Sequence, residues 1–147
     1  MAGRISGILQ RLLDERKITR IRPDKKLVLK EIQGAEHDLS RAKVTYGEED
    51  YKWATVQAYY CMFHSARALL YSKGFREKSH RALLTAIREL FGKTGVMENS
   101  LIQSFEEAMG LREQADYGLT FGEHSAAAIL RDAEKFLEGI KQILRLP

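Results

Sequence analysis

The sequence has 147 residues, of which 44% are hydrophobic and 30% are charged, and its net charge is +4. This length fits one domain, and the composition excludes a disordered chain. No run of about 18 uncharged apolar residues occurs, so we expect no membrane segment. Cys61 is the single cysteine, which excludes an intramolecular disulfide, and charged residues interrupt the N-terminal apolar run. We therefore expect a cytoplasmic protein without a signal peptide.

The positive charge is concentrated near the N-terminus. The first 30 residues contain nine Lys and Arg and three Asp and Glu, whereas the remaining 117 contain 15 basic and 17 acidic side chains. The chain therefore divides into a basic N-terminal arm with a short amphipathic helix, residues 1–24, and a nearly neutral helical bundle, residues 25–147. Such a charge distribution excludes a uniformly basic surface for nucleic acid.

Hydrophobic periodicity predicts a series of helices. Residues 5–17 form a short amphipathic helix, and the alternating run 18–22 is too short to build a sheet alone. A second amphipathic helix follows over about 26–45. Apolar residues cover nearly the whole circumference of 50–73, which predicts a central, mostly buried helix that Gly74 closes.

The second half of the chain continues the pattern. A helix is predicted over about 80–91, another begins at Asn99 or Ser100, and the last covers about 126–144. The predicted fold is all-α: an up-down bundle of four to five long helices with short connections, plus the short N-terminal helix.

Three groups of polar residues stand out, and the first is Arg112, Asp116 and Tyr117. Arg112 and Asp116 are four residues apart, so their side chains meet on one helix face and can form an ion pair. One interpretation is a salt bridge that fixes the helix register. The other is a phosphate site, because a fixed guanidinium presents a fork of donors to phosphate oxygens.

The second group follows helical spacing along the central helix, in steps of four, three and four: Tyr60, His64, Arg67 and Tyr71. A histidine on a buried helix is usually a core residue with satisfied hydrogen bonds, which is the simpler interpretation of His64. If this face of the helix lies against Arg112 and Asp116, a polar cleft would form between the two helices.

The third group, Lys78, Ser79 and His80, precedes or begins a predicted helix. It is interpreted either as a secondary anion site at a helix N-terminus or as ordinary capping by Ser79 beside solvated charges. The four histidines are too far apart in the sequence for a metal motif, and we expect neither a metal nor a bound cofactor.

Three segments together resemble the HEPN domain (higher eukaryote and prokaryote nucleotide-binding). They are Tyr59–Tyr71, Lys78-Ser79-His80 and Arg112–Gly118, and the similarity covers about residues 25–145. The last segment is similar to the prokaryotic branch whose motif reads Arg-x-x-Ala-Asp-Tyr. The resemblance implies a four- or five-helix bundle, commonly homodimeric, with a polar cleft near the dimer interface.

The resemblance also implies a function. Many relatives pair with a small nucleotidyltransferase, often as a toxin–antitoxin system, and several branches are metal-independent ribonucleases with an Arg-x4-6-His motif. This sequence departs from that motif, because eleven residues separate Arg112 from the next histidine, His124. An ionised Asp116 cannot donate a proton to a leaving oxygen and repels phosphate. Ribonuclease activity would then need His64 or His80 from another helix.

The sequence therefore predicts a dimeric HEPN subunit that is non-catalytic or weakly active. It would pair with a small nucleotidyltransferase, and Arg112 would hold the phosphate of an ATP-like nucleotide, with Tyr117 a candidate acceptor for nucleotidylation. One alternative is a metal-independent endoribonuclease. Another is an RNA-binding module that uses the basic arm.

Overall fold

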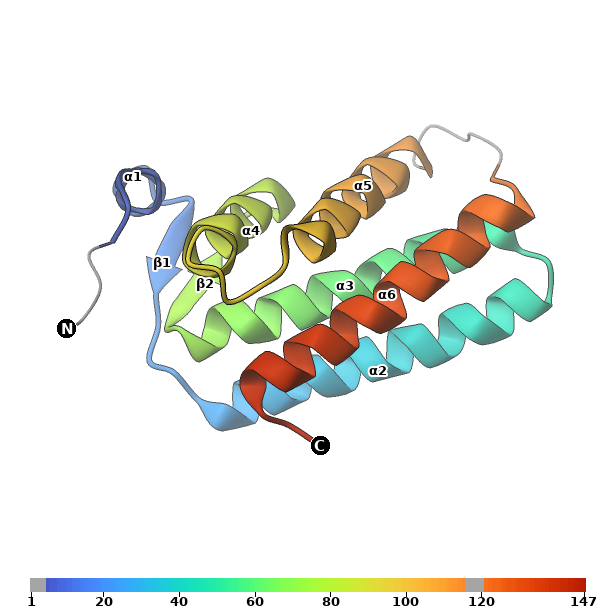
Figure 1. The fold of residues 1–147 in the computed structure, drawn as a ribbon, viewed down its shortest axis with the longest axis horizontal. Helices are drawn as coiled ribbons and strands as arrows, with labels where there is room; N and C mark the ends of the chain where they lie inside the picture. The colour runs from blue at the N-terminus through green and yellow to red at the C-terminus, as the bar shows by residue number, and fades with distance from the viewer. Residues whose placement is uncertain (1–4, 116–120) are drawn as a thin grey trace.

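The computed structural model describes residues 5–115 and 121–147 (Figure 1). The predicted all-α bundle is confirmed, and two short strands accompany it. The helices are α1 Gly7–Asp14, α2 Lys25–Gly47, α3 Tyr51–Ser72, α4 His80–Ile87, α5 Asn99–Ala115 and α6 Glu123–Leu144. A π-helical segment, Arg88–Gly92, continues α4, and the strands are β1 Ile18–Arg20 and β2 Phe75–Glu77.

The bundle is built around α3, as its all-round apolar sequence predicts. The helices α2, α3 and α6 lie side by side along the long axis of the molecule, and α5 packs against α3 and α6 (Figure 1). Alanines on α3, including Ala54, Ala58 and Ala66, are completely buried, which allows its neighbours to approach closely. No helix in the described ranges has both the length and the apolar character needed to cross a membrane.

The two strands form an antiparallel ribbon at one end of the bundle. The run at 18–22 was expected to be too short for a sheet alone, and it is paired with β2, which sequence analysis did not identify. Gly74 makes the turn that leads from α3 into β2, with a φ of +81°. A side chain at this position would be strained and would lie 3.1 Å from the carbonyl oxygen of Ile21, so glycine is required here.

The N-terminal helix α1 is fixed to the bundle by packing and by one polar contact. Its residues Leu9 and Leu12 are buried in the common core. Ser6 caps α1 by accepting from the backbone N–H of Leu9, and its hydroxyl donates to Oε1 of Glu89 at 2.8 Å. Lys93 pairs with Glu89, and these contacts lower the pKa of Glu89 although burial opposes them. Within the described residues, the arm is thus packed against the bundle.

Candidate functional site

The candidate site lies on one face of α3, where Tyr60, His64 and Arg67 follow steps of four and three residues. This spacing aligns the three side chains along the helix, and all three are half-buried. The helix α2 lies along one side of this face, and α4 and α5 also pack against α3. Groups from five elements therefore meet here: α2, α3, β2, α4 and α5.

Arg112, in the last turn of α5, lies over the ring of Tyr60. Its guanidinium carbon is 5.9 Å from the ring centroid, within the range of a cation–π contact, and the side chain is half-buried. The ring of His80 meets the same tyrosine edge-on, with the centroids 6.3 Å apart. Arg112 and His80 are thus neighbours of one aromatic ring.

A salt bridge beside this pair links α4 to α5. Nη2 of Arg81 lies 3.2 Å and 3.3 Å from the two carboxylate oxygens of Glu113. Both side chains are about half exposed, so the pair contributes little to stability. Because Arg81 and Glu113 directly follow His80 and Arg112 in the sequence, the bridge orients the two helix ends that carry the site.

His80 is held by aromatic contacts and by one hydrogen bond. Its ring stacks on Phe63 with centroids 4.5 Å apart, and Nδ1 lies 2.5 Å from the hydroxyl oxygen of Tyr59. Burial lowers the pKa of His80, and the positive charge of Arg112 lowers it further. The imidazole is therefore neutral at neutral pH.

The hydrogen bond from Tyr59 decides which nitrogen of His80 carries the proton. Tyr59 is completely buried, and burial raises the pKa of its hydroxyl, so it stays protonated. A buried O–H needs an acceptor, and within the described residues Nδ1 of His80 is the partner that this hydroxyl has. Tyr59 thus donates to Nδ1, which leaves the proton of the neutral ring on Nε2. His80 offers an N–H donor to a ligand.

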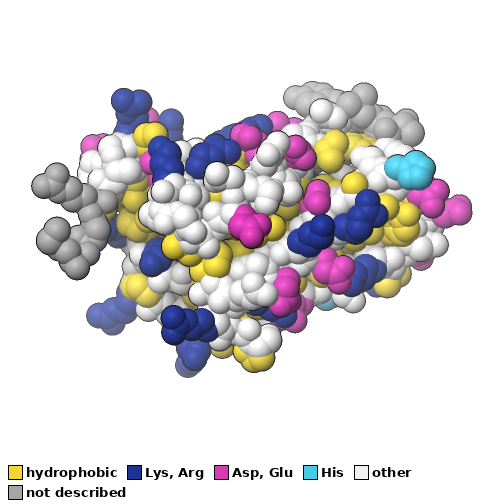
Figure 2. All heavy atoms as spheres, viewed as in Figure 1, with side chains coloured by type: hydrophobic (Ala, Val, Ile, Leu, Met, Phe, Trp, Pro, Cys, Tyr) yellow, Lys and Arg dark blue, Asp and Glu magenta, His cyan; other side chains and the backbone are white. Residues whose placement is uncertain are grey.

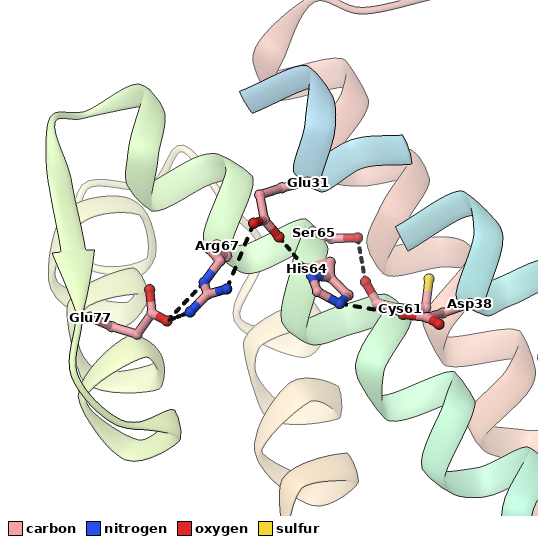
Figure 3. A network of polar contacts seen from close by, with 7 residues as sticks. All are labelled: Glu31, Asp38, Cys61, His64, Ser65, Arg67 and Glu77. Carbon is pink, nitrogen blue, oxygen red and sulfur yellow. Dashed lines mark hydrogen bonds and ion pairs between the residues drawn. The ribbon is translucent and has the colours of Figure 1, made fainter. Parts of the chain in front are cut away.

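Arg67 is neutralised by a buried carboxylate from β2 (Figure 3). Its Nε donates to Oε2 of Glu77 at 2.9 Å, and Nη2 forms an ion pair with the same oxygen at 2.7 Å. The Glu77 side chain is only 3% exposed. Arg67 also lies over the ring of Phe63, 4.9 Å from its centroid, so the ribbon, α3 and the His80 ring share one cluster.

His64 is bound by carboxylates from α2 (Figure 3). Its Nδ1 lies 2.6 Å from Oε2 of Glu31, and its Nε2 lies 3.5 Å from Oδ2 of Asp38. Burial raises the pKa of Asp38, whereas the nearby His64 opposes this shift. Gly34 lies beneath the imidazole, where an added Cβ would be 3.6 Å from the ring. His64 therefore has the satisfied partners expected of a structural histidine.

These pairings leave an uneven distribution of charge. Arg67 and His64 each have carboxylate partners, whereas in the described part of the chain no carboxylate lies within ion-pair distance of Arg112. Asp116 and Tyr117, predicted to accompany Arg112, lie outside the described residues. Arg112 and the Nε2–H of His80 are thus the donors from which an anion site can be built.

The residues of the third predicted group differ in their surroundings. Ser79 accepts from the backbone N–H of Ala82 and caps α4, which is the simpler of the two interpretations. Lys78 is exposed on the ribbon, whereas His80 turns toward Tyr59 and Phe63. The structure thus gives Lys78 and His80 different surroundings and places His80 and Arg112 beside the same ring.

Sequence analysis missed the partners of the predicted residues: Tyr59, Glu31, Asp38 and Glu77. Glu31 and Asp38 are seven residues apart and share a face of α2 with Gly34, a spacing that the sequence does contain. Within the described segments, no cluster of three or more His, Cys, Asp or Glu side chains is arranged to hold a metal ion.

Comparison with known proteins places the chain in a family. Two proteins of Methanocaldococcus jannaschii, each named a candidate toxin, are 34% and 32% identical over 115 residues. These matches cover 78% and 77% of this chain and 86% and 78% of the relatives. A UPF0332 protein of Archaeoglobus fulgidus is 33% identical over 112 residues, covering 75% of this chain and 89% of the relative. The HEPN domain family model matches residues 29–143, and this chain belongs to the HEPN domain family.

Proposed function

We propose that this chain is a toxin-like HEPN protein whose site at Arg112, His80 and Tyr60 binds a phosphate group of a nucleotide. The names of the two relatives from M. jannaschii support a toxin-like role. The observation that carries the phosphate assignment is that Arg112 and His80 flank the same ring, one charged and the other a neutral N–H donor.

The electrostatics of the site support binding of an anion. The cation–π contact with Tyr60 holds the guanidinium in place, so less side-chain entropy is lost when a ligand binds. A guanidinium and an adjacent N–H can both donate to one phosphate group. Because Glu77 already neutralises Arg67, added negative charge is drawn to Arg112.

Isothermal titration with ATP and with inorganic phosphate tests this assignment. Arg112→Gln should weaken binding at least tenfold, since a charge-assisted hydrogen bond contributes about 1.5–3 kcal/mol. His80→Gln keeps an N–H donor and should weaken it less than His80→Ala. The control Arg131→Gln removes an exposed charge from α6 and should have no effect. Equal affinity of Arg112→Gln and the wild type would reject the site.

We also propose that the protein works as a homodimer with a small nucleotidyltransferase. Copurification of the two chains and the mass of the free protein in solution test this assembly. Incubation with the partner and labelled ATP tests whether Tyr117 accepts a nucleotidyl group. Transfer to the wild type with loss in Tyr117→Phe would support acceptance, whereas equal transfer to both would exclude Tyr117.

A metal-independent endoribonuclease is the second candidate, favoured by the position of His80. The segment after Arg112 lacks a histidine, and α4 supplies an imidazole to the same aromatic ring. With its proton on Nε2, however, His80 is a donor rather than a base, so binding is the better-supported role. Cleavage of single-stranded RNA in EDTA that is lost in both Arg112→Ala and His80→Gln would establish catalysis instead.

A further inference from the structure

The ribbon of β1 and β2 presents basic residues on its outer face. Thr19 lies opposite Arg76, and the backbone N–H of Lys78 donates to the carbonyl oxygen of Lys17 at 2.9 Å, which extends the pairing by one residue. Three alternate positions of the ribbon are buried: Ile18, Phe75 and Glu77. Because successive side chains of a strand point to opposite faces, Lys17, Thr19, Arg76 and Lys78 share the outer face.

This arrangement of charge has a cost for the stability of the ribbon. Lys17, just before β1, lies directly opposite Lys78, just after β2. Arg76 of β2 is on the same face of the ribbon. Like charges in such cross-strand positions are destabilising, and β-branched residues would pair better. A short ribbon that keeps three cations together offers a surface on which an anionic ligand can offset their repulsion.

The positive charge extends beyond the outer face. Residues 16–26 contain six Lys and Arg and one Asp, and residues 75–78 add two more cations and Glu77, which is already bound to Arg67. In the described structure, the one ion pair made by these eight cations joins Lys17 to Glu15. Lys and Arg side chains gather over the end of the molecule that carries α1 and β1 (Figure 2).

We propose that the ribbon binds the phosphodiester backbone of single-stranded nucleic acid and leads that strand to the phosphate site. Ser79 alone separates Lys78 from His80, so the ribbon ends beside the site. Arg20 belongs to the other face of the ribbon, where its exposed side chain lies over the Phe75 ring, 5.3 Å from the centroid, and an unpaired base of the same strand can stack on its guanidinium. The contact of the nucleic-acid strand with Arg112 rests on the proposed function.

The ribbon also extends the family's domain. The matched region begins at residue 29, so β2 lies inside it, whereas β1 and the basic segment precede it. The N-terminal arm, fixed by the contact between Ser6 and Glu89, thus adds a strand and its charge to the common bundle. With the ribbon, the site would bind a ligand longer than one nucleotide, which the bundle without β1 and the basic segment would not.

Fluorescence anisotropy with labelled 12-nucleotide oligouridylate tests the proposal. The double variant Arg76→Gln/Lys78→Gln removes two exposed charges from the ribbon. The matched control Arg131→Gln/Lys135→Gln removes two exposed charges from α6, so the net charges of the two variants are equal. In about 0.1 M salt, loss of two phosphate contacts should weaken binding roughly 10- to 30-fold and reduce the salt slope by about 1.4. The control variant should bind oligouridylate with wild-type affinity. The wild type should bind a DNA probe of equal length with similar affinity.

Three outcomes would overturn the proposal. Equal weakening in the ribbon variant and the α6 control would mean that attraction is only diffuse. Oligonucleotide affinity no higher than that of a mononucleotide would mean that the ribbon makes no contact. If the ribbon variant instead loses only its affinity for polyglutamate, the ribbon is a surface for an acidic protein.

A mononucleotide titration separates this proposal from the proposed function. The ribbon variant should bind ATP with wild-type affinity, whereas Arg112→Gln should not. If the wild type does not bind ATP but the ribbon variant still binds oligouridylate more weakly than its control, the phosphate site fails and the ribbon assignment stands.

Discussion

The hydroxyl of Tyr59 donates its proton to Nδ1 of His80 across 2.5 Å, and this bond joins the centre of the bundle to the candidate site. It stabilises the neutral imidazole, because protonation of Nδ1 would remove the acceptor. Tyr59→Phe should therefore raise the pKa of His80 toward the ordinary value of 6.5. Side-chain nitrogen shifts in an NMR titration measure this pKa and identify the Nε2–H tautomer. In Tyr46→Phe, which has no contact with His80, the pKa should not move; a pKa unchanged in both variants would contradict the bond.

The pKa of His80 also predicts how stability depends on pH. The folded state lowers this pKa, so between the folded and unfolded values the unfolded state binds more protons. Stability from His80 is thus complete above about pH 6.5 and decreases as pH falls through that value toward the folded pKa. His80→Gln should reduce the slope of unfolding free energy against pH in this window. Urea denaturation from pH 7.5 to 5 measures it, and a slope as steep as that of the wild type would show that other groups are responsible.

The ion pair between Glu77 and Arg67 should contribute more than a surface pair. Glu77→Gln removes the nearer and more deeply buried of the two carboxylates paired with Arg67, leaves only the longer 3.7 Å contact with Glu31, and should lower the free energy of unfolding by about 2 kcal/mol. Glu134→Gln removes the same charge from an exposed pair with Lys43 and should cost less than about 0.5 kcal/mol. Chemical denaturation of both variants compares them, and equal losses would be evidence against a structural role for Glu77.

Ser6 should control the local stability of α1. Ser6→Ala removes the cap of Leu9 and the bond to Glu89, and loss of a cap costs about 1 kcal/mol. Hydrogen exchange of α1 amides should then be about fivefold faster or more. Ser79→Ala, which removes the equivalent cap from α4, should accelerate exchange in α4 and leave α1 unchanged. If α1 exchanges at the wild-type rate in Ser6→Ala, the arm is held by Leu9 and Leu12 alone.

Much of the fold could be predicted because helical periodicity is a local property of the sequence. The central helix was predicted over 50–73 and is Tyr51–Ser72. Its apolar residues indicate a buried helix, and Gly74 indicates where the helix ends. The ribbon could not be predicted in the same way. Ile18–Arg20 and Phe75–Glu77 have three residues each, and their pairing depends on where α3 returns the chain.

The candidate site could likewise be predicted only in part. The alignment of Tyr60, His64 and Arg67 follows from their spacing on one helix. Their partners do not, because the rotation of α2 about its axis brings Glu31 to His64, and the orientation of α4 decides that His80 faces inward. That α4 places an imidazole beside the same aromatic ring as Arg112 is therefore a property of tertiary structure, not of the motif around Arg112.

Because β2 belongs to the common bundle and β1 to the arm, the arm covers one hydrogen-bonding edge of β2. Without residues 18–20, the amide and carbonyl groups of 75–77 that now bond to them would be left open along a sheet edge, which is a template for strands of other molecules. Loss of the N-terminal arm would thus convert a protected turn of the bundle into a self-association surface.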